Sequence, residues 1–403
     1  MIWEYFFPAL FGTAVFVQFI YLLFVFTALA GYRGEEDNEE ERDLPGVSVV
    51  VAAWNEIKNL QELIPLLAEQ DYPDFEIIIV DDRSSDGTYD YLLDIHNAFP
   101  NVRFVHVKAL PEHFTAKKYA VTMGLKKAQK EVVLLTDADC RPNSKYWIRE
   151  MAEALGPDKE VVLGFSPYYE YPGRLNAFIR YETFQTALQY FSFARVGVPF
   201  MGVGRNLMYR KEAFWAVNGF TKHLALLSGD DDLLINEIAH SKNTAICISE
   251  ESHVYSEPKR TFKEWVTQKR RHLSVGKRYK FRDKLTIGLL WFSFILVWFS
   301  FVPALLSAPA WFVMPKWLIV PNEWLAPYGI EHYEPITNWM RVVLGVFLAW
   351  LLLRWLILSL CNRKLGKTVR AGKILYYDFL YWLYLVVFGL MTLISNPKKI
   401  KWR

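Results

Sequence analysis

Two carboxylates, Asp137 and Asp139, follow an apolar run in the stretch EVVLLTDADCRP. The run VVLLT predicts a buried strand that ends by Pro142, and residues two apart on a strand point to the same side. Like charges held so close repel unless a cation lies between them or one takes up a proton. Oxygen ligands suit Mg²⁺ or Mn²⁺, which also bridge to phosphates. We therefore expect a metal site here, with a solvated loop or a helix cap as the alternative.

A second acidic group, with Asp230 and Asp231 in LSGDDDLLINEIA, precedes an amphipathic segment. Acids at a helix N-terminus often only complement the helix dipole. Three in a row after a glycine exceed that need, and a carboxylate can act as the general base that takes a proton from a hydroxyl. The group is therefore a candidate for proton transfer.

Polar residues also end two earlier apolar runs, as Asn55-Glu56 and Asp81-Asp82. Apolar runs and segments of helical period alternate along this part of the chain, which predicts an α/β domain with parallel strands. Ligands of such sheets bind at the carboxyl ends of the strands. The sequence contains neither GxGxxG nor GxxxxGK[ST], which argues against a dinucleotide oxidoreductase and a P-loop enzyme. The predicted strands are residues 47–53, 75–82, 102–107 and 131–139.

The chain divides by composition into a globular part and membrane parts. Of 403 residues, 52% are hydrophobic and 22% are charged, and the net charge of +3 gives no indication of nucleic-acid binding. Cys140, Cys247 and Cys361 form no CxxC pair, which fits a reducing compartment and argues against disulfides or a zinc site. Residues 6–30 carry no charge and no basic segment precedes them, so we expect an uncleaved membrane helix rather than a signal peptide. Further expected spans are residues 285–313, 339–360 and 374–395.

The orientation of these spans is ambiguous. The basic loop CNRKLGKTVRAGK, residues 361–373, should be cytoplasmic, but the basic tail NPKKIKWR would then lie outside if every span crosses. Either one span is re-entrant or interfacial, or the tail is an exception. Arg341, Arg354 and Asp378 are too few ionisable residues in the spans to favour a transporter.

Over residues 45–275 the chain resembles the family 2 glycosyltransferases of GT-A fold. The resemblance depends on five motifs in order: VVVAAWNE, IIIVDDRSSDGT, TDAD, GDDDL and QKRRH, the last similar to QxxRW with His272 in place of Trp. It implies an α/β fold with a mixed, mostly parallel sheet, flanked by N-terminal and C-terminal transmembrane helices. The basic stretch around QKRRH is alternatively a helix on the membrane surface.

The resemblance also implies roles for individual residues. Asp139, with Asp137, would hold Mn²⁺ or Mg²⁺, and Asp230 would be the catalytic base, with Asp231 as the alternative. Asp82 would meet the base of the nucleotide, although turn chemistry also explains it. The expected donor-binding residues are Ala52, Asn55, Glu56, Asp82, Lys117, Asp137, Gln268 and Arg271.

The expected protein is a metal-dependent inverting hexosyltransferase of the inner membrane, with its catalytic domain in the cytoplasm. A UDP- or GDP-sugar would be the donor, and a lipid or lipid-linked molecule of glycolipid or cell-envelope glycan synthesis the acceptor. A processive polysaccharide synthase and a catalytically silent membrane scaffold are the alternatives. The expected parts are an anchor (1–33), a glycosyltransferase domain (45–255), an amphipathic interface helix with the QxxR motif (256–284) and a membrane region (285–403).

Overall fold

The computed structural model describes residues 2–34, 44–307 and 335–394, and its globular domain is built on one seven-stranded sheet. The strand order is β3-β2-β1-β4-β7-β6-β8. The strands are β1 (Val47–Ala53), β2 (Phe75–Asp82), β3 (Val102–Val107), β4 (Val132–Asp137), β6 (Val161–Leu163), β7 (Leu207–Arg210) and β8 (Thr244–Ile246). A second sheet pairs β5 (Cys140–Pro142) with β9 (Val254–Ser256).

The first four strands lie within two residues of their predicted bounds and pair in parallel. The apolar runs of β1, β2 and β4 are buried on both faces, as parallel strands covered by helices should be, whereas the edge strand β3 is half-buried. Strand β7 runs antiparallel to both of its neighbours, so the sheet is mixed and mostly parallel. The predicted fold class is confirmed.

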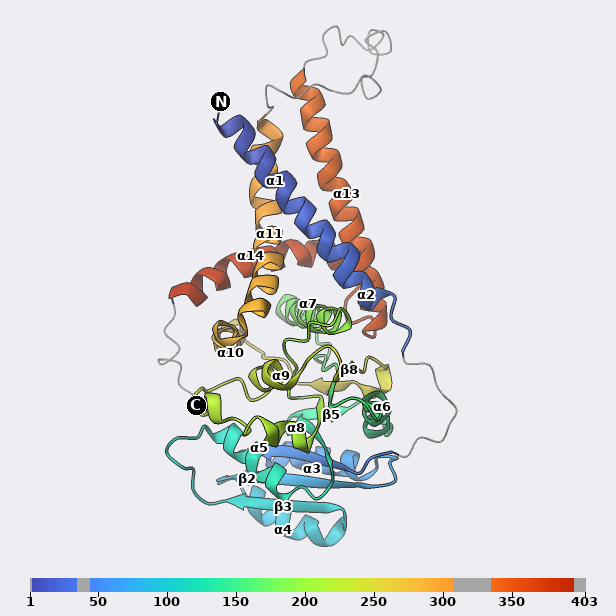
Figure 1. Cartoon of the computed structure of the whole chain (residues 1–403). Coiled ribbons are helices and arrows are strands. Elements are labelled where there is room, and N and C mark those ends of the chain that lie inside the picture. The colour runs from blue at the N-terminus through green and yellow to red at the C-terminus, as the bar shows by residue number, and fades with distance from the viewer. Residues whose placement is uncertain (1, 35–43, 308–334, 395–403) are drawn as a thin grey trace.

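Helices cover both faces of this sheet (Figure 1). The helices of the globular domain are α3 (Ile57–Ala68), α4 (Thr88–Ala98), α5 (Ala116–Lys127), α6 (Trp147–Leu155), α7 (Arg174–Arg195), α8 (Lys211–Ala216), α9 (Asp232–Ile238) and α10 (Phe262–Leu273). Of these, α10 packs against α14 rather than against the sheet. In α3 the apolar residues at spacings of three and four are fully buried, which explains why its helical period was readable. The sequence analysis missed the 22-residue helix α7, because its buried face mixes aromatic, amide and hydroxyl side chains.

Four apolar segments associate the protein with a membrane. The first consists of α1 (Ile2–Ile20), a π-helical turn (Tyr21–Phe26) and α2 (Thr27–Ala30); the others are α11 (Phe281–Leu306), α13 (Pro335–Lys364) and α14 (Ile374–Ile394). Each is long and apolar enough to cross a bilayer. Residues 308–313 of the second expected span, residue 395, residues 35–43 of the acidic linker and the basic tail lie outside the described residues.

The fourth apolar helix is oriented differently from the other three. Helices α1, α11 and α13 extend away from the globular domain, whereas α14 lies across their domain-proximal ends (Figure 1). Rings of α14 contact both the globular domain and α11: Trp265 of α10 lies 5.7 Å from Tyr384 and 5.5 Å from Phe388, and Trp298 of α11 lies 5.2 Å from Phe379. Helix α14 therefore lies between the other apolar helices and the globular domain.

The expected interface helix is divided, because α10 ends at Leu273 and α11 begins at Phe281.

A buried ion pair fastens α14 in this position. Arg354 of α13 donates to Asp378 of α14, with Nη2 and Oδ1 2.8 Å apart, and both side chains are almost completely buried. Tyr181 and Gln185 of α7 also donate to the Asp378 carboxylate, at 2.7 and 3.2 Å. Gln18 of α1 lies 3.4 Å from Arg354 Nη1. The charge pair is thus surrounded by hydrogen-bonding groups from both the globular domain and the membrane helices, which fixes one relative to the other.

Substituting Asp378→Ala should loosen this junction. The change leaves the Arg354 guanidinium buried without its carboxylate, which typically costs about 3–5 kcal/mol. We expect a clear fall in the thermal unfolding midpoint of the detergent-purified chain. The control is Asp94→Ala, which removes an exposed carboxylate from α4. Equal midpoints for the two variants would contradict a stabilising role of the pair.

Candidate active site

Lys117 brings the two acidic groups together at the carboxyl end of the sheet. Its Nζ lies 2.9 Å from Asp137 Oδ1, at the end of β4, and 3.1 Å from Asp230 Oδ2, ahead of α9. Burial opposes a charged lysine, but the two carboxylates outweigh it and raise the pKa of Lys117 well above its usual value. The sequence analysis placed Lys117 beside the nucleotide and did not anticipate that it bridges both acidic motifs.

The pKa values of the two neighbouring acids are shifted in opposite directions. Burial opposes ionisation of Asp230, but the charge and hydrogen bond of Lys117 outweigh it, so the pKa of Asp230 is lowered. The pKa of Asp231 is raised, by burial and then by the charge of Asp230. Backbone N–H groups hold the Asp231 carboxylate, one from Gly204 at 2.9 Å and one from Asp232 at 2.8 Å. Asp230 is therefore the acid that stays ionised and points to Lys117, while Asp231 is tied into the backbone.

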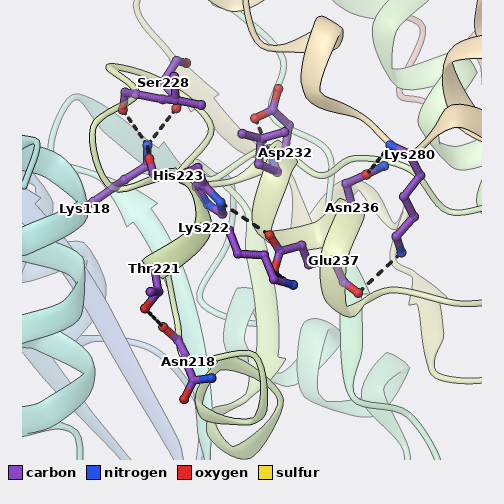
Figure 2. Close-up of polar contacts among 12 residues, drawn as sticks. Lys118, Asn218, Thr221, Lys222, His223, Ser228, Asp232, Asn236, Glu237 and Lys280 are labelled. Atoms are coloured by element: carbon purple, nitrogen blue, oxygen red, sulfur yellow. Dashed lines mark hydrogen bonds and ion pairs between the residues drawn. The ribbon is translucent and has the colours of Figure 1, made fainter.

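Asp232 connects the acidic loop to the membrane helix. Tyr279 Oη donates to its carboxylate at 2.9 Å, and burial, followed by the charge of Asp231, raises the pKa of Asp232 well above its usual value. One turn further along α9, Asn236 donates to Asp283 of α11 at 2.8 Å and accepts from the backbone N–H of Lys280 at 3.0 Å. Figure 2 shows the Asn236–Lys280 contact beside Asp232. The start of α11 thus fixes the helix that follows the acids.

Lys118, the neighbour of Lys117, fixes the loop ahead of the acids from the other side. Its buried Nζ donates to the carbonyl oxygens of His223, Leu226 and Ser228, at 2.9, 2.5 and 2.9 Å (Figure 2). Three donors meeting three carbonyls satisfy the ammonium group completely. Burial nevertheless lowers the pKa of Lys118 to about 8. Nothing in the sequence indicated that Lys118 would hold this loop.

The donor atoms around Asp139 fit a hard divalent cation. Carboxylate oxygens of Asp137 and Asp139 and the sulfur of Cys140 lie within 4.8 Å of one another. Burial, and then the charge of Asp137, raises the pKa of Asp139. Burial also raises the pKa of the Cys140 thiol, which keeps it protonated and unsuited as a ligand. Two carboxylates without a thiolate suit Mg²⁺ or Mn²⁺.

The expected nucleotide residues gather at the ends of β1 and β2. Ala52 pairs in register with Asp137, and Glu56 lies close enough to Asp139 and Asp137 that their charges, after burial, raise its pKa. Asn55 accepts from the backbone N–H of Ser85 at 2.7 Å. The buried Asp82 carboxylate accepts from Arg83 Nε at 2.8 Å. These residues adjoin the acidic pair but do not line the cavity described next.

One cavity of about 730 Å³ extends from the acids to the membrane helices. One end is lined by Asp137, Asp139 and Asp230, and the other by aromatic side chains such as Trp291 of α11 and Tyr384 of α14. Between these ends lies the buried ion pair of Glu182 (α7) and Lys269 (α10). The cavity is polar at the catalytic end and largely apolar at the membrane end.

The QxxR residues lie on the wall of this cavity. Gln268 donates to Tyr168 Oη at 3.4 Å, and Arg271 Nη2 lies 3.2 Å from the His272 ring nitrogen. Arg205, which the sequence analysis missed, also lines the cavity, and its guanidinium lies 4.5 Å from the centre of the Tyr168 ring. The sequence feature that could have identified Arg205 is its position in GVGRN, where it follows two glycines and precedes a strand. The structure therefore gathers arginines from two elements at the acidic end.

The site consists of an acidic pair at the end of β4 that Lys117 joins to a second acidic group at the carboxyl end of a mostly parallel sheet. Comparison with known proteins finds glycosyltransferases. Residues 48–217 match the family model "Glycosyl transferase family 2". Glycosyltransferase AglE of Haloferax volcanii is 26% identical over 190 residues, which are 47% of this chain and 59% of that protein. The poly-β-1,6-N-acetyl-D-glucosamine synthase of Staphylococcus epidermidis is 32% identical over 100 residues, covering 25% and 23% of the two chains.

Among solved structures, the mannosyltransferase PcManGT from Pyrobaculum calidifontis, in complex with GDP-Man and Mn²⁺, aligns with a TM-score of 0.55 at 18% identity. The alignment covers 87% of this chain and 98% of that one, and at this identity it shows a shared fold. The globular domain, over residues 48–217, therefore matches glycosyl transferase family 2, in agreement with the expected family. Since the matches span less than two thirds of both curated relatives, they do not carry over a substrate.

The depressed pKa of Lys118 predicts a pH dependence of stability. Between about pH 8 and 10.5 the lysine is neutral in the folded chain but still binds a proton in the unfolded chain, so its contribution to the free energy of unfolding rises with pH. We expect Lys118→Met to lack this rise and to unfold at a lower temperature, because three carbonyls lose their donor. The measurement compares unfolding midpoints of both proteins from pH 7.5 to 9.5. Lys126→Met, at an exposed position of the same helix, is the control, and parallel curves for Lys118→Met and wild type would refute the assignment.

Proposed function

We propose that this protein is a membrane-bound inverting glycosyltransferase that moves a sugar from a nucleotide-sugar donor to a lipid or lipid-linked acceptor. The observation that carries the proposal is the single cavity that joins Asp139 and Asp230 to the apolar side chains of α11 and α14. A soluble acceptor would have no use for such an apolar extension. The acceptor class fits a step of glycolipid or cell-envelope glycan synthesis.

The donor is a UDP- or GDP-sugar whose diphosphate meets a divalent metal at Asp139 and Asp137. Bound there, Mn²⁺ or Mg²⁺ would neutralise the diphosphate and stabilise it as a leaving group. The structural relative was solved with GDP-Man and Mn²⁺, which supports this metal and donor class. Ala52, Asn55, Glu56 and Asp82 would hold the nucleotide along the ends of β1 and β2.

Asp230 is the proposed base that takes the proton of the acceptor hydroxyl. A general base must be unprotonated when the acceptor arrives, and Lys117 keeps Asp230 in that state. Asp231 is the alternative, although its carboxylate is occupied by the N–H groups of Gly204 and Asp232. Arg271 and Gln268 line the same cavity and would meet the donor phosphates.

The direction of α14 supports a topology in which α1, α11 and α13 cross the membrane and α14 lies in its interface. Three crossings place the catalytic domain, the basic loop 361–373 and the C-terminal tail on one side. Positively charged loops face the cytoplasm, so that side would be cytoplasmic. This arrangement removes the conflict that four crossings create for the basic tail, and it fits a protein of the inner membrane.

The metal assignment is tested by Asp139→Ala. Wild-type protein should be stabilised by a UDP or GDP compound with Mn²⁺, since a ligand present at 100 times its Kd adds about 2.7 kcal/mol. The variant should lose this stabilisation, because the metal loses its main ligand. The measurement is the thermal unfolding midpoint of the detergent-purified chain with a panel of nucleotide diphosphates and nucleotide sugars, with and without Mn²⁺. A Mn²⁺-dependent shift that survives in Asp139→Ala would place the metal elsewhere.

The base assignment is tested by comparing Asp230→Asn with Asp231→Asn. Asp230→Asn should keep donor-induced stabilisation but lose about 10²- to 10⁴-fold in sugar transfer, the usual contribution of a general base. Asp231→Asn should retain more activity. Transfer of labelled sugar from the donor identified in the panel is measured for both. If Asp231→Asn is the inactive variant and Asp230→Asn is not, the base is Asp231.

A further inference from the structure

The acceptor end of the cavity is formed by one face each of α11 and α14. On α11 the lining residues Lys284, Ile287, Gly288 and Trp291 are spaced by three and four, as residues on one side of a helix are. On α14 the lining residues are Tyr381, Tyr384, Leu385, Phe388 and Gly389, with the same spacing. Because Lys284 lies in the first turn of α11, the face runs from a cation near the catalytic domain to apolar groups about 10 Å further along the helix.

Two glycines leave this end open. A methyl group added at Gly288 or at Gly389 would meet no atom within 4 Å, although both residues line the cavity. Large apolar side chains are exposed on the outer sides of the same two helices, including Phe292 (60% exposed) of α11 and Leu390 (57% exposed) of α14. Such a surface belongs in the apolar part of a bilayer. The opening therefore faces hydrocarbon rather than water.

Two lysines lie where the head group of a lipid bound in this cavity would be. Lys277, between α10 and α11, and Lys284 both line the cavity and are exposed. Neither forms an ion pair with any residue in the described ranges, in contrast to Lys117 and Lys269, which are both paired with carboxylates. Lysines at the ends of membrane helices keep their ammonium groups at the interface, where lipid phosphates lie. An anionic group would be attracted to this position.

We propose that the acceptor is a lipid with a phosphate-bearing head group, and that its apolar chain enters the cavity sideways from the bilayer between Gly288 and Gly389. The phosphate contacts Lys277 and Lys284, and the chain lies along the apolar faces of α11 and α14. The head group is thereby directed toward Asp230. The inference rests on the proposed function for the role of this lipid as acceptor, but the binding site itself can be tested without turnover.

The binding test uses dodecyl phosphate as the probe, with the full chain in phosphatidylcholine nanodiscs. Dodecyl phosphate should raise the unfolding midpoint of wild-type protein, whereas dodecanol and inorganic phosphate at equal concentration should not. Gly389→Leu and Lys284→Gln should lose the shift. The matched controls are Gly345→Leu, at a glycine of α13 that also meets no neighbour, and Lys263→Gln, at an exposed lysine of α10; neither lines the cavity, and both should keep the shift.

The other outcomes of the binding test overturn the proposal. An equal shift with inorganic phosphate would indicate a site for free phosphate, and an equal shift with dodecanol would exclude recognition of the head group. Unchanged shifts in Gly389→Leu and Lys284→Gln, or no shift in the wild type, would show that this opening does not take the lipid.

The transfer test separates this inference from the proposed function. Nanodiscs that also contain a membrane lipid extract receive the labelled donor, and the product is recovered by organic extraction. Gly288→Leu and Gly389→Leu should reduce this product at least about tenfold, because overpacking by a leucine side chain obstructs the path. Donor-induced stabilisation should remain, and Gly345→Leu should transfer like wild type. Labelled product found only in the aqueous phase would overturn the lipid route and leave the glycosyltransferase standing, whereas absence of donor binding in the wild type would refute the proposed function itself.

Discussion

The site depends on the placement of one lysine among buried carboxylates. Asp137 follows β4 and Asp230 lies 93 positions later, and without a cation between them their charges would repel in a poorly solvated place. Lys117 on α5 supplies that cation and is itself held ionised by the two acids. The metal proposed at Asp139 would add a second positive charge to the same cluster. Most of the surrounding architecture serves to keep these groups together.

Two supports act on the acidic loop from opposite sides. Lys118 binds the loop to α5 through three carbonyl oxygens, and Tyr279 and Asp283 bind α9 to the start of α11. The second support means that the start of an apolar helix helps to orient the acidic loop. The Arg354–Asp378 pair and its partners on α7 hold α14 against the same domain. Two separate sets of polar contacts therefore join the globular domain to the apolar helices.

The contact between the globular domain and the apolar helices helps to explain the apolar composition of the chain. A transferase of the proposed kind, acting on a lipid, would have to bring a polar reaction and a hydrocarbon chain within one site, without exposing the chain to water or burying unpaired charge. Here the polar end of the cavity is neutralised by ion pairs, and the membrane end is built from aromatic side chains and glycines of α11 and α14. Because α14 lies across the domain-proximal ends of the other apolar helices, it covers the cavity and contacts α7 and α10 at the same time.

The sequence alone determined the first four strands, the order of the acidic motifs and the apolar segments, because hydrophobic period and strand-end polarity are local properties. Long-range contacts were decided only by the tertiary structure. The bridge by Lys117, the Tyr279–Asp232 hydrogen bond and the stacking of Arg205 on Tyr168 join residues far apart in the chain, and no spacing encodes them. Helix α7 was invisible because its buried face carries polar groups whose partners lie on other helices. The direction of α14 was undecidable from its composition, since an apolar helix of that length is equally suited to crossing a bilayer or lying along a buried interface, and its packing partners made the choice.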